Sequence, residues 1–206
     1  MSEFAANKAL ELRGMQVLKG LLDRDAQERM VEELRHVIRA APLFSPVTQS
    51  GKIMSVRMTS AGRFGWISDR NGYRYSETHP DGMPWPEMPP LVSRVWDTVS
   101  GCARTPECCL INFYGESARM GMHQDIDEVD FSAPVVSISL GDDALFRVGN
   151  EARGGRTESI WLTSGDVVVM GGASRRLFHG VDRVKHGSST LLPRAGRINV
   201  TLRVVT

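Results

Sequence analysis

The chain has 206 residues, which is enough for one well-buried core and short for two domains. Its 25 basic and 24 acidic residues balance, so the chain as a whole shows no polyelectrolyte bias. With three cysteines, no signal peptide and no apolar run of about 18 residues, it is neither a disulfide scaffold nor a typical membrane protein. We therefore expect one cytoplasmic domain over residues 1–206, monomeric and without membrane contact.

The N-terminal part of the chain predicts one helix after a polar start. Residues 1–13 are polar, and we expect them to be loosely held. Asp23 is a suitable cap for a helix over residues 23–41, because apolar side chains recur there at helical spacing and Pro42 stops the pattern. A second apolar pattern predicts a helix over residues 91–100.

The segment between these helices, residues 43–90, is rich in Gly, Ser, Thr and Pro and carries four Trp or Tyr residues. It is long for a connection in a compact domain, and long loops of this kind are usually lids or binding segments. We therefore predict a functional flap over residues 43–90.

From residue 107 onward the pattern changes to short strands separated by Gly-containing turns. The predicted strands are Cys108–Tyr114, Pro134–Leu140, Ala144–Val148, Ser159–Leu162, Asp166–Met170 and Arg197–Val205. Helices ahead of many short strands indicate an α+β fold, in which a sandwich or barrel packs on its helices.

Charge is unevenly distributed along this strand-rich part. Residues 107–146 hold one basic and eight acidic residues, whereas residues 147–203 hold ten basic and four acidic ones. The second segment could form a basic surface that suits a phosphate backbone. The alternative, charges scattered over a solvated surface, stays open at this point.

The triplet His123-Gln124-Asp125 carries the strongest chemical signal. In an extended strand, side chains two residues apart point the same way, so an imidazole and a carboxylate can face one point. His179, placed after an apolar pair and before Gly180, is the best third ligand. Two histidines and one carboxylate leave open positions on a metal, which is the arrangement of non-haem Fe(II) oxygenases. Taken singly, each histidine is better explained as a hydrogen-bonded structural residue, and only the three together favour a metal site.

The run Arg197–Arg203 alternates polar and apolar side chains. Arg197, Asn199, Thr201 and Arg203 share one face of the predicted strand, and the other face is apolar. Two arginines facing inward suggest a bound dicarboxylate, because a guanidinium can grip a carboxylate bidentately. Upstream, an amide and a phenol two residues apart, Asn112 and Tyr114, would be suitable additional donors.

Taken together, these patterns resemble the bacterial AlkB proteins, a family of Fe(II)- and 2-oxoglutarate-dependent DNA and RNA dealkylases. The matching blocks occur in order between residues 50 and 203: Met54-Ser55-Val56, Gly65-Trp66, Gly72-Tyr73, Cys109 to Tyr114, His123 to Glu128, Ala133 to Gly141, Gly165 to Gly172, Phe178-His179-Gly180 and Arg197 to Arg203.

The resemblance implies a double-stranded β-helix (jelly-roll) core, supported by N-terminal helices, with residues 43–90 as a nucleotide-recognition flap. It implies Fe(II), 2-oxoglutarate and O2 as cofactor and cosubstrates. The implied iron ligands, which are also the catalytic residues, are His123, Asp125 and His179. The implied 2-oxoglutarate contacts are Asn112, Tyr114, Arg197, Asn199, Thr201 and Arg203. The implied substrate contacts are Met54, Trp66, Tyr73, Asp127 and Arg153. Met170 is a departure, since some relatives carry Trp there.

The implied reaction is oxidative demethylation of N-alkylated bases such as 1-methyladenine and 3-methylcytosine in DNA, with single-stranded DNA as the expected form, and with release of formaldehyde, succinate and CO2. Such a base must leave its duplex stack to reach a buried metal. One alternative is an RNA or tRNA demethylase of the same family, and another is a 2-oxoglutarate-dependent hydroxylase of proteins or small molecules. A zinc hydrolase or a non-catalytic metal-binding jelly roll fits less well, because neither needs paired internal arginines.

Overall fold

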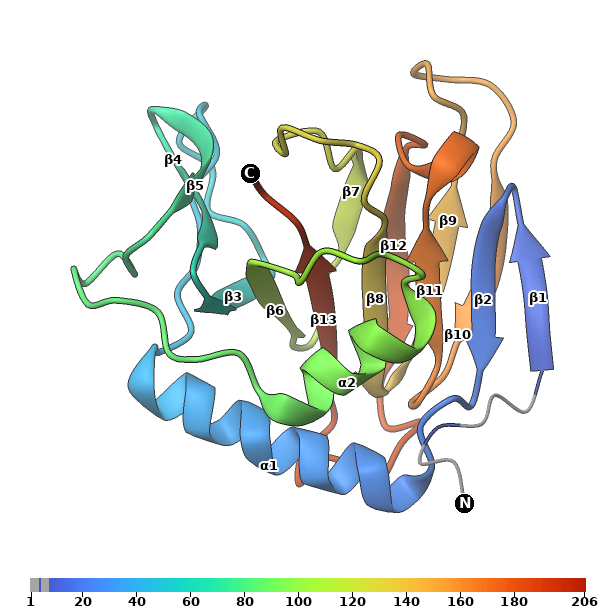
Figure 1. The fold of residues 1–206 in the computed structure, drawn as a ribbon, viewed down its shortest axis with the longest axis horizontal. Coiled ribbons are helices and arrows are strands. Elements are labelled where there is room, and N and C mark those ends of the chain that lie inside the picture. The colour runs from blue at the N-terminus through green and yellow to red at the C-terminus, as the bar shows by residue number, and fades with distance from the viewer. Residues whose placement is uncertain (1–3, 5–7) are drawn as a thin grey trace.

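A computed structural model of the chain describes residue 4 and residues 8–206. Its largest layer is a seven-stranded antiparallel sheet with the strand order β1-β2-β11-β8-β13-β6-β3 (Figure 1). These strands are β1 (Lys8–Leu12), β2 (Met15–Lys19), β3 (Arg57–Gly62), β6 (Cys108–Tyr114), β8 (Val135–Gly141), β11 (Val167–Met170) and β13 (Arg197–Arg203). The predicted C-terminal strands therefore form, with ends that shift by one or two residues.

A second sheet has four strands in the order β10-β9-β12-β7. They are β7 (Met120–His123), β9 (Asp143–Val148), β10 (Glu158–Leu162) and β12 (His179–Lys185). The two sheets face one another, since apolar side chains of β2, β8 and β11 pack against those of β9 and β10. Two facing antiparallel sheets with two helices confirm the predicted α+β fold with a jelly-roll core.

Both predicted helices are present. Helix α1 (Arg24–Ala40) begins after Asp23, whose side chain accepts a hydrogen bond from the backbone N–H of Ala26. Helix α2 (Pro90–Val99) has a proline in its first turn, where no N–H partner is lost. No helix among the described residues is long and apolar enough to cross a membrane.

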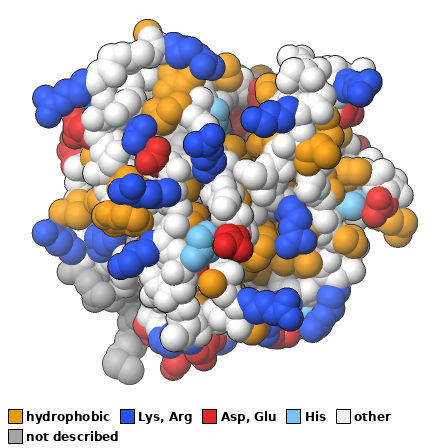
Figure 2. Space-filling model, turned by 180° about the vertical axis from the view of Figure 1, so that it is seen from behind, with side chains coloured by type: hydrophobic (Ala, Val, Ile, Leu, Met, Phe, Trp, Pro, Cys, Tyr) orange, Lys and Arg blue, Asp and Glu red, His pale blue; other side chains and the backbone are white. Residues whose placement is uncertain are grey.

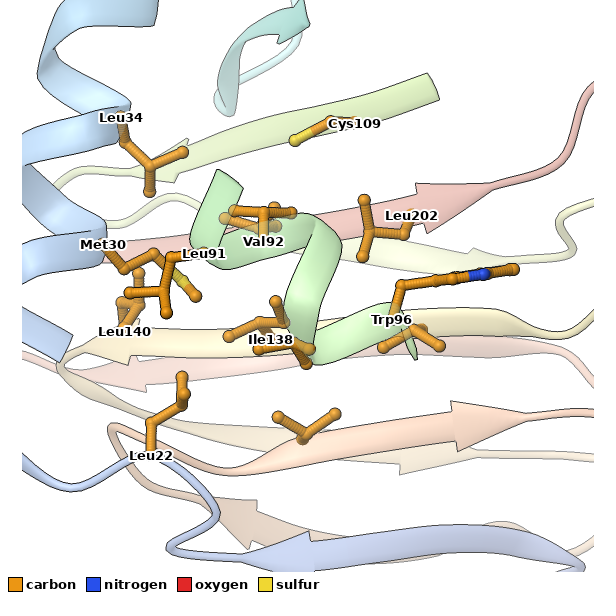
Figure 3. Packing of buried hydrophobic residues seen from close by; sticks show 14 of the residues in the cluster. Leu22, Met30, Leu34, Leu91, Val92, Trp96, Cys109, Ile138, Leu140 and Leu202 are labelled. Atoms are coloured by element: carbon orange, nitrogen blue, oxygen red, sulfur yellow. The ribbon is translucent and has the colours of Figure 1, made fainter. Parts of the chain in front are cut away.

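The helices cover the outer face of the large sheet. Figure 3 shows Leu91, Val92 and Trp96 of α2 lying over Ile138 and Leu202 of the sheet. The same cluster includes Ile198 and Val200, so the apolar face of β13 lies under the helices. Because side chains alternate along a strand, the two arginines of β13 then face the space between the sheets.

The N-terminal prediction was wrong for the described residues 8–12, which form strand β1 and are not loosely held. The strands β1 and β2 pair as a hairpin joined by Arg13 and Gly14, with φ of 53° and 83°. Such a two-residue turn favours Asn-Gly or Asp-Gly, so Arg-Gly is a weak signal in the sequence. Residues 1–3 and 5–7 lie outside the described part.

The segment 43–90 contains more regular structure than its composition indicated. Its strand β3 pairs with β6 in the large sheet, and β4 (Gly65–Asp69) pairs with β5 (Gly72–Ser76) as a separate hairpin. Figure 1 shows this β4–β5 hairpin standing apart from the two sheets. Polar side chains stand at buried as well as exposed positions of these strands, for example Thr59 and Ser60 in β3, so apolar and polar residues do not alternate. The sequence pattern missed the strands for that reason.

The close approach of Gly65 to Trp85 gives a prediction about the hairpin. A Cβ at Gly65 would lie 2.2 Å from ring atoms of Trp85, which is buried and donates a hydrogen bond to the Ser76 carbonyl. Gly65→Ala is therefore expected to lower the free energy of unfolding by about 1–3 kcal/mol, the usual cost of overpacking. Urea unfolding measures this. Gly115→Ala is the control, because its Cβ would meet only Phe113 at 3.7 Å. Equal stability of the two variants would contradict the prediction.

Candidate functional site

One cavity of about 550 Å³ opens between the two sheets and the β4–β5 hairpin, a size that suits a small-molecule site. Its walls include every site residue that the sequence predicted: Met54, Trp66, Tyr73, Asn112, Tyr114, His123, Asp125, Asp127, Arg153, His179, Arg197, Asn199, Thr201 and Arg203. Residues separated by up to 149 positions in the chain therefore meet around one space.

The two histidines are held at adjoining strand ends. His123 ends β7, His179 begins β12, and the two are paired across the sheet, with ring centroids 4.6 Å apart. Each Nδ1 lies within hydrogen-bond distance of a backbone carbonyl two residues earlier, Gly121 at 2.9 Å and Leu177 at 3.0 Å. When Nδ1 donates to these carbonyls, both Nε2 atoms are left as acceptors for a metal.

Asp125 lies in the loop after β7, so the sequence argument that it extends the strand of His123 was wrong. Its position depends on Arg203, whose Nη2 is 2.9 Å from Oδ1, and on Arg175, whose Nη1 donates to the Asp125 carbonyl at 2.6 Å. Burial opposes the charged form of Asp125, but Arg203 and the two histidines outweigh it and hold the pKa below its usual value. The carboxylate is therefore ionised at neutral pH.

The three side chains form a group that fits a metal ion. Their ligand atoms all lie within 4.8 Å of one another, and Asp125 Oδ2 is buried without a hydrogen-bond partner. Burial, with a contribution from His123, lowers the pKa of His179 to about 4. Its imidazole is then neutral at pH 7, the form that binds metals. A buried carboxylate and two imidazoles suit Fe(II).

The two arginines of β13 present unpartnered donors to the same cavity. Arg197 donates to the Asp142 carbonyl at 3.2 Å and to Ser139 Oγ at 2.7 Å, and its Nε has no partner. Nη1 of Arg203 is also without a hydrogen bond. Burial lowers the pKa of Arg197, as expected for a guanidinium poorly matched by negative charge. Such donors fit a dianionic ligand like 2-oxoglutarate.

Neutral polar groups complete this part of the wall. The Asn112 side-chain oxygen is buried and unpartnered, and burial raises the pKa of Tyr114 to about 12, so its phenol stays protonated. Asn199 donates to Ser137 Oγ at 2.7 Å and accepts from Thr201 Oγ1 at 3.1 Å. An orphaned buried oxygen marks a place where a ligand or water must donate.

Two aromatic side chains of the β4–β5 hairpin, Trp66 and Tyr73, form another part of the cavity wall. Trp66 and Tyr73 stack, with ring centroids 5.4 Å apart and planes 16° from parallel. Trp66 Nε1 donates to Asp127 Oδ2 at 2.8 Å, which ties the hairpin to the loop after β7. Trp66 also packs on a small cluster that includes Met58 and Cys108, whereas Tyr73 is half exposed.

The structure adds wall residues that the sequence did not single out. Besides Met54 and Met170, the thioethers of Met58, Met120 and Met122 line the cavity. Thioether side chains are unbranched and polarisable, so this wall can adapt to ligands of different shape. Scattered single methionines in short strands carry no recognisable pattern, which is why sequence reasoning missed them.

Arg153 lies at the rim and reaches over the ring of Phe178, with its guanidinium carbon 5.1 Å from the ring centroid. Its neighbours in the segment 147–203 do not all face solvent, because Arg175, Arg197 and Arg203 are buried. The basic surface is therefore weaker than the sequence count indicated. Figure 2 shows Lys and Arg side chains, in blue, spread among hydrophobic and uncharged ones on the face behind Figure 1.

Comparison with known proteins agrees with this geometry. Residues 14–203 match the family described as the 2OG-Fe(II) oxygenase superfamily. The chain is 49% identical over 191 residues to an alpha-ketoglutarate-dependent dioxygenase AlkB homolog of Caulobacter vibrioides, covering 92% of this chain and 87% of that protein. It is 38% identical to AlkB of Escherichia coli over 184 residues, covering 87% and 85%. The chain belongs to the 2OG-Fe(II) oxygenase superfamily and, within it, to the AlkB family.

A solved structure supports the same assignment. The structure of OsALKBH1 superimposes with a TM-score of 0.82 at 33% sequence identity, and the match covers 95% of this chain and 99% of that one. The protein is accordingly an Fe(II)- and 2-oxoglutarate-dependent dioxygenase.

Proposed function

We propose that this dioxygenase removes alkyl groups oxidatively from damaged nucleic-acid bases, such as 1-methyladenine and 3-methylcytosine, with DNA as its main substrate. The observation that carries the proposal is that one cavity is lined by three groups: the three side chains that could hold a metal, the two arginines of β13 that could bind a dicarboxylate, and the stacked rings of Trp66 and Tyr73. A hydroxylase of small molecules has no need of an aromatic hairpin at the mouth of its site.

We assign the metal to His123, Asp125 and His179, and 2-oxoglutarate to Arg197, Arg203 and the polar groups beside them. When bound there, Fe(II) with 2-oxoglutarate and O2 would supply the oxidising power to hydroxylate the N-alkyl carbon, with succinate and CO2 as coproducts. The hydroxylated product releases formaldehyde and the repaired base.

The base itself is assigned to the hairpin end of the cavity. Trp66 and Tyr73 present ring faces, which bind any base by stacking, and a flipped or single-stranded base can reach them. Asp127 lies beside Trp66 and carries a carboxylate that favours a positively charged lesion electrostatically. Met54 packs with Trp66 against one small cluster. Arg153 also lines the cavity, where it offers a charge to a phosphate.

We also propose that residues 1–206 work as one domain, with residues 43–90 supplying the nucleotide-recognition flap. The β4–β5 hairpin supports this role because it belongs to neither main sheet and borders the cavity. Three free cysteines suit a reducing compartment, and we propose a cytoplasmic monomer.

The test is succinate and formaldehyde release by the Fe(II)-loaded protein with four matched oligonucleotides: DNA and RNA, each with and without one 3-methylcytosine. We expect formaldehyde only from the methylated strands, with the DNA strand turned over faster. A faster reaction on RNA would assign an RNA demethylase. Succinate release that no methylated strand stimulates would contradict nucleic-acid repair altogether.

The aromatic pair gives a further prediction. Tyr73→Ala and Trp66→Ala together are expected to weaken binding of a methylated oligonucleotide by about 1–3 kcal/mol or more, the usual worth of base stacking. Decarboxylation of 2-oxoglutarate without nucleic acid should continue, because neither ring contacts the metal ligands. Both are measured on the same preparation.

Tyr73→Phe is the matched control and should bind like the wild type, since it keeps the ring. The contacts of Trp66 with the Met58 cluster make a melting curve necessary for its variant. Unchanged repair in the double variant would place both rings outside the site, and equal loss of both activities with a lower Tm would assign them to the fold.

A further inference from the structure

Glu128 is buried just behind the cavity wall, where it meets three side chains from different parts of the fold. Its carboxylate is 1% exposed. Oε2 lies 3.0 Å from Arg175 Nη2, and Oε1 lies 3.3 Å from Arg203 Nε and accepts a hydrogen bond from the hydroxyl of Tyr75. A buried carboxylate holds such partners in fixed positions, because moving a partner away would leave the carboxylate or the guanidinium buried without a compensating charge.

Two of these partners act directly on the proposed metal and cosubstrate sites. Arg175 donates to the carbonyl of Asp125 at 2.6 Å and to that of Ala133 at 3.1 Å, so it joins two points of the loop between β7 and β8. Arg203 contacts the Asp125 carboxylate through Nη2, while neither Nε nor Nη1 has a hydrogen bond. Glu128 holds the Nε edge of Arg203 through an ion pair at 3.3 Å, and Nη1, which has no such partner, is left for a cosubstrate carboxylate.

The third partner connects this buried network to the hairpin. Tyr75 lies in β5, directly opposite Trp66 of β4. The hairpin thus contacts the loop after β7 at two consecutive acids, since Trp66 donates to Asp127 and Tyr75 donates to Glu128. A shift of the hairpin must change the Tyr75 contact, and Glu128 passes that change to Arg203.

We propose that Glu128 is a positioning residue. It couples the contact between the β4–β5 hairpin and the loop after β7 to the binding of 2-oxoglutarate at Arg203, and the Tyr75 hydroxyl is the link. The inference rests on the proposed assignment of 2-oxoglutarate to Arg203. Coupling between two binding sites is reciprocal. A nucleic acid that holds the hairpin against the loop therefore raises the affinity for 2-oxoglutarate, and 2-oxoglutarate raises the affinity for the nucleic acid by the same factor.

The experiment is calorimetric titration of 2-oxoglutarate into protein loaded with Mn(II) in place of iron, without and with a saturating 3-methylcytosine oligonucleotide. In the wild type we expect the oligonucleotide to tighten 2-oxoglutarate binding by about fivefold or more, a typical coupling. Tyr75→Phe keeps the ring and removes the hydroxyl. It should bind 2-oxoglutarate within about twofold of the wild type when alone, and lose the enhancement.

Glu128→Gln should weaken 2-oxoglutarate binding even without nucleic acid, because an amide cannot hold two guanidinium groups. In steady-state assays with Fe(II), its KM for 2-oxoglutarate should rise while kcat at saturation is kept, a split that general destabilisation does not produce. Glu116→Gln, which neutralises an exposed acid elsewhere, is the matched control and should behave like the wild type.

The outcomes separate this inference from the proposed function. Wild-type protein that binds no 2-oxoglutarate would overturn the cosubstrate assignment itself. Wild-type protein that binds it with the same affinity with and without the oligonucleotide would overturn the coupling alone. An oligonucleotide that enhances 2-oxoglutarate binding equally in Tyr75→Phe and in the wild type would also overturn the coupling. The Tyr75→Phe variant provides this test even if Glu128→Gln fails to fold.

Discussion

Arg203→Ala is expected to raise the 2-oxoglutarate concentration needed for half-maximal turnover by about two orders of magnitude, in line with the cost of truncating one partner of a buried charge pair. The side chain is buried, its Nη1 is unpartnered, and it is held by Asp125 on one edge and Glu128 on the other. Arg203→Lys should restore the affinity only in part, because an ammonium is a point charge and cannot reproduce the planar fork.

Removing Arg203 takes a cationic partner away from two buried acids, Asp125 and Glu128, although Glu128 keeps Arg175 and Tyr75. The alanine variant must therefore be checked for folding. Circular dichroism and a melting curve serve this purpose, and Arg203→Lys, which keeps the positive charge, separates lost affinity from lost stability. Arg183→Ala is the matched control, since this exposed arginine of β12 lies over Trp161 and away from the cavity. An unchanged 2-oxoglutarate titration in folded Arg203→Ala would remove this residue from the cosubstrate site.

Substitution of any of the three proposed metal ligands is expected to abolish formaldehyde release. His123→Ala and His179→Ala each leave two ligands, and losing one of three sharply weakens a metal. For the carboxylate we prefer Asp125→Asn to Asp125→Ala, because the amide keeps the shape of the side chain beside Arg203. All three variants should keep their fold, and their bound iron should fall with their turnover.

Iron content is measured on the purified protein after loading, together with formaldehyde release from a methylated oligonucleotide. His36→Ala is the control, since His36 is exposed on helix α1, where its Nδ1 lies 2.9 Å from the Glu32 carbonyl oxygen, and it does not line the cavity. A variant that keeps both iron and turnover would exclude the substituted residue from the metal centre. Lost turnover with full iron content would assign it to a step other than metal binding.

Both helices, six of the eight strands after residue 107 and the α+β class could be predicted from the sequence, because each is specified by local chemistry. Strands β7 and β12, which carry the two histidines, were not predicted. Asp23 caps α1 through its own side chain, and the alternation in β13 separates an apolar face from one that carries Arg197 and Arg203. The sequence also suggested the residues proposed for the metal and for 2-oxoglutarate, since both sites need unusual polar side chains at short spacing within a strand-rich segment. The proposed substrate contacts followed mainly from the resemblance to the AlkB family.

The tertiary structure alone decided how these residues are held. Asp125 lies beyond the end of β7, and its place depends on Arg203 and Arg175, which lie 78 and 50 residues away in the chain. Glu128 appeared in the sequence only as part of a matching block, because nothing local reveals that it is buried between two arginines and a tyrosine of the hairpin. Buried ion pairs of this kind form only when segments that are distant in the chain pack together and exclude water. A local sequence pattern therefore cannot predict them.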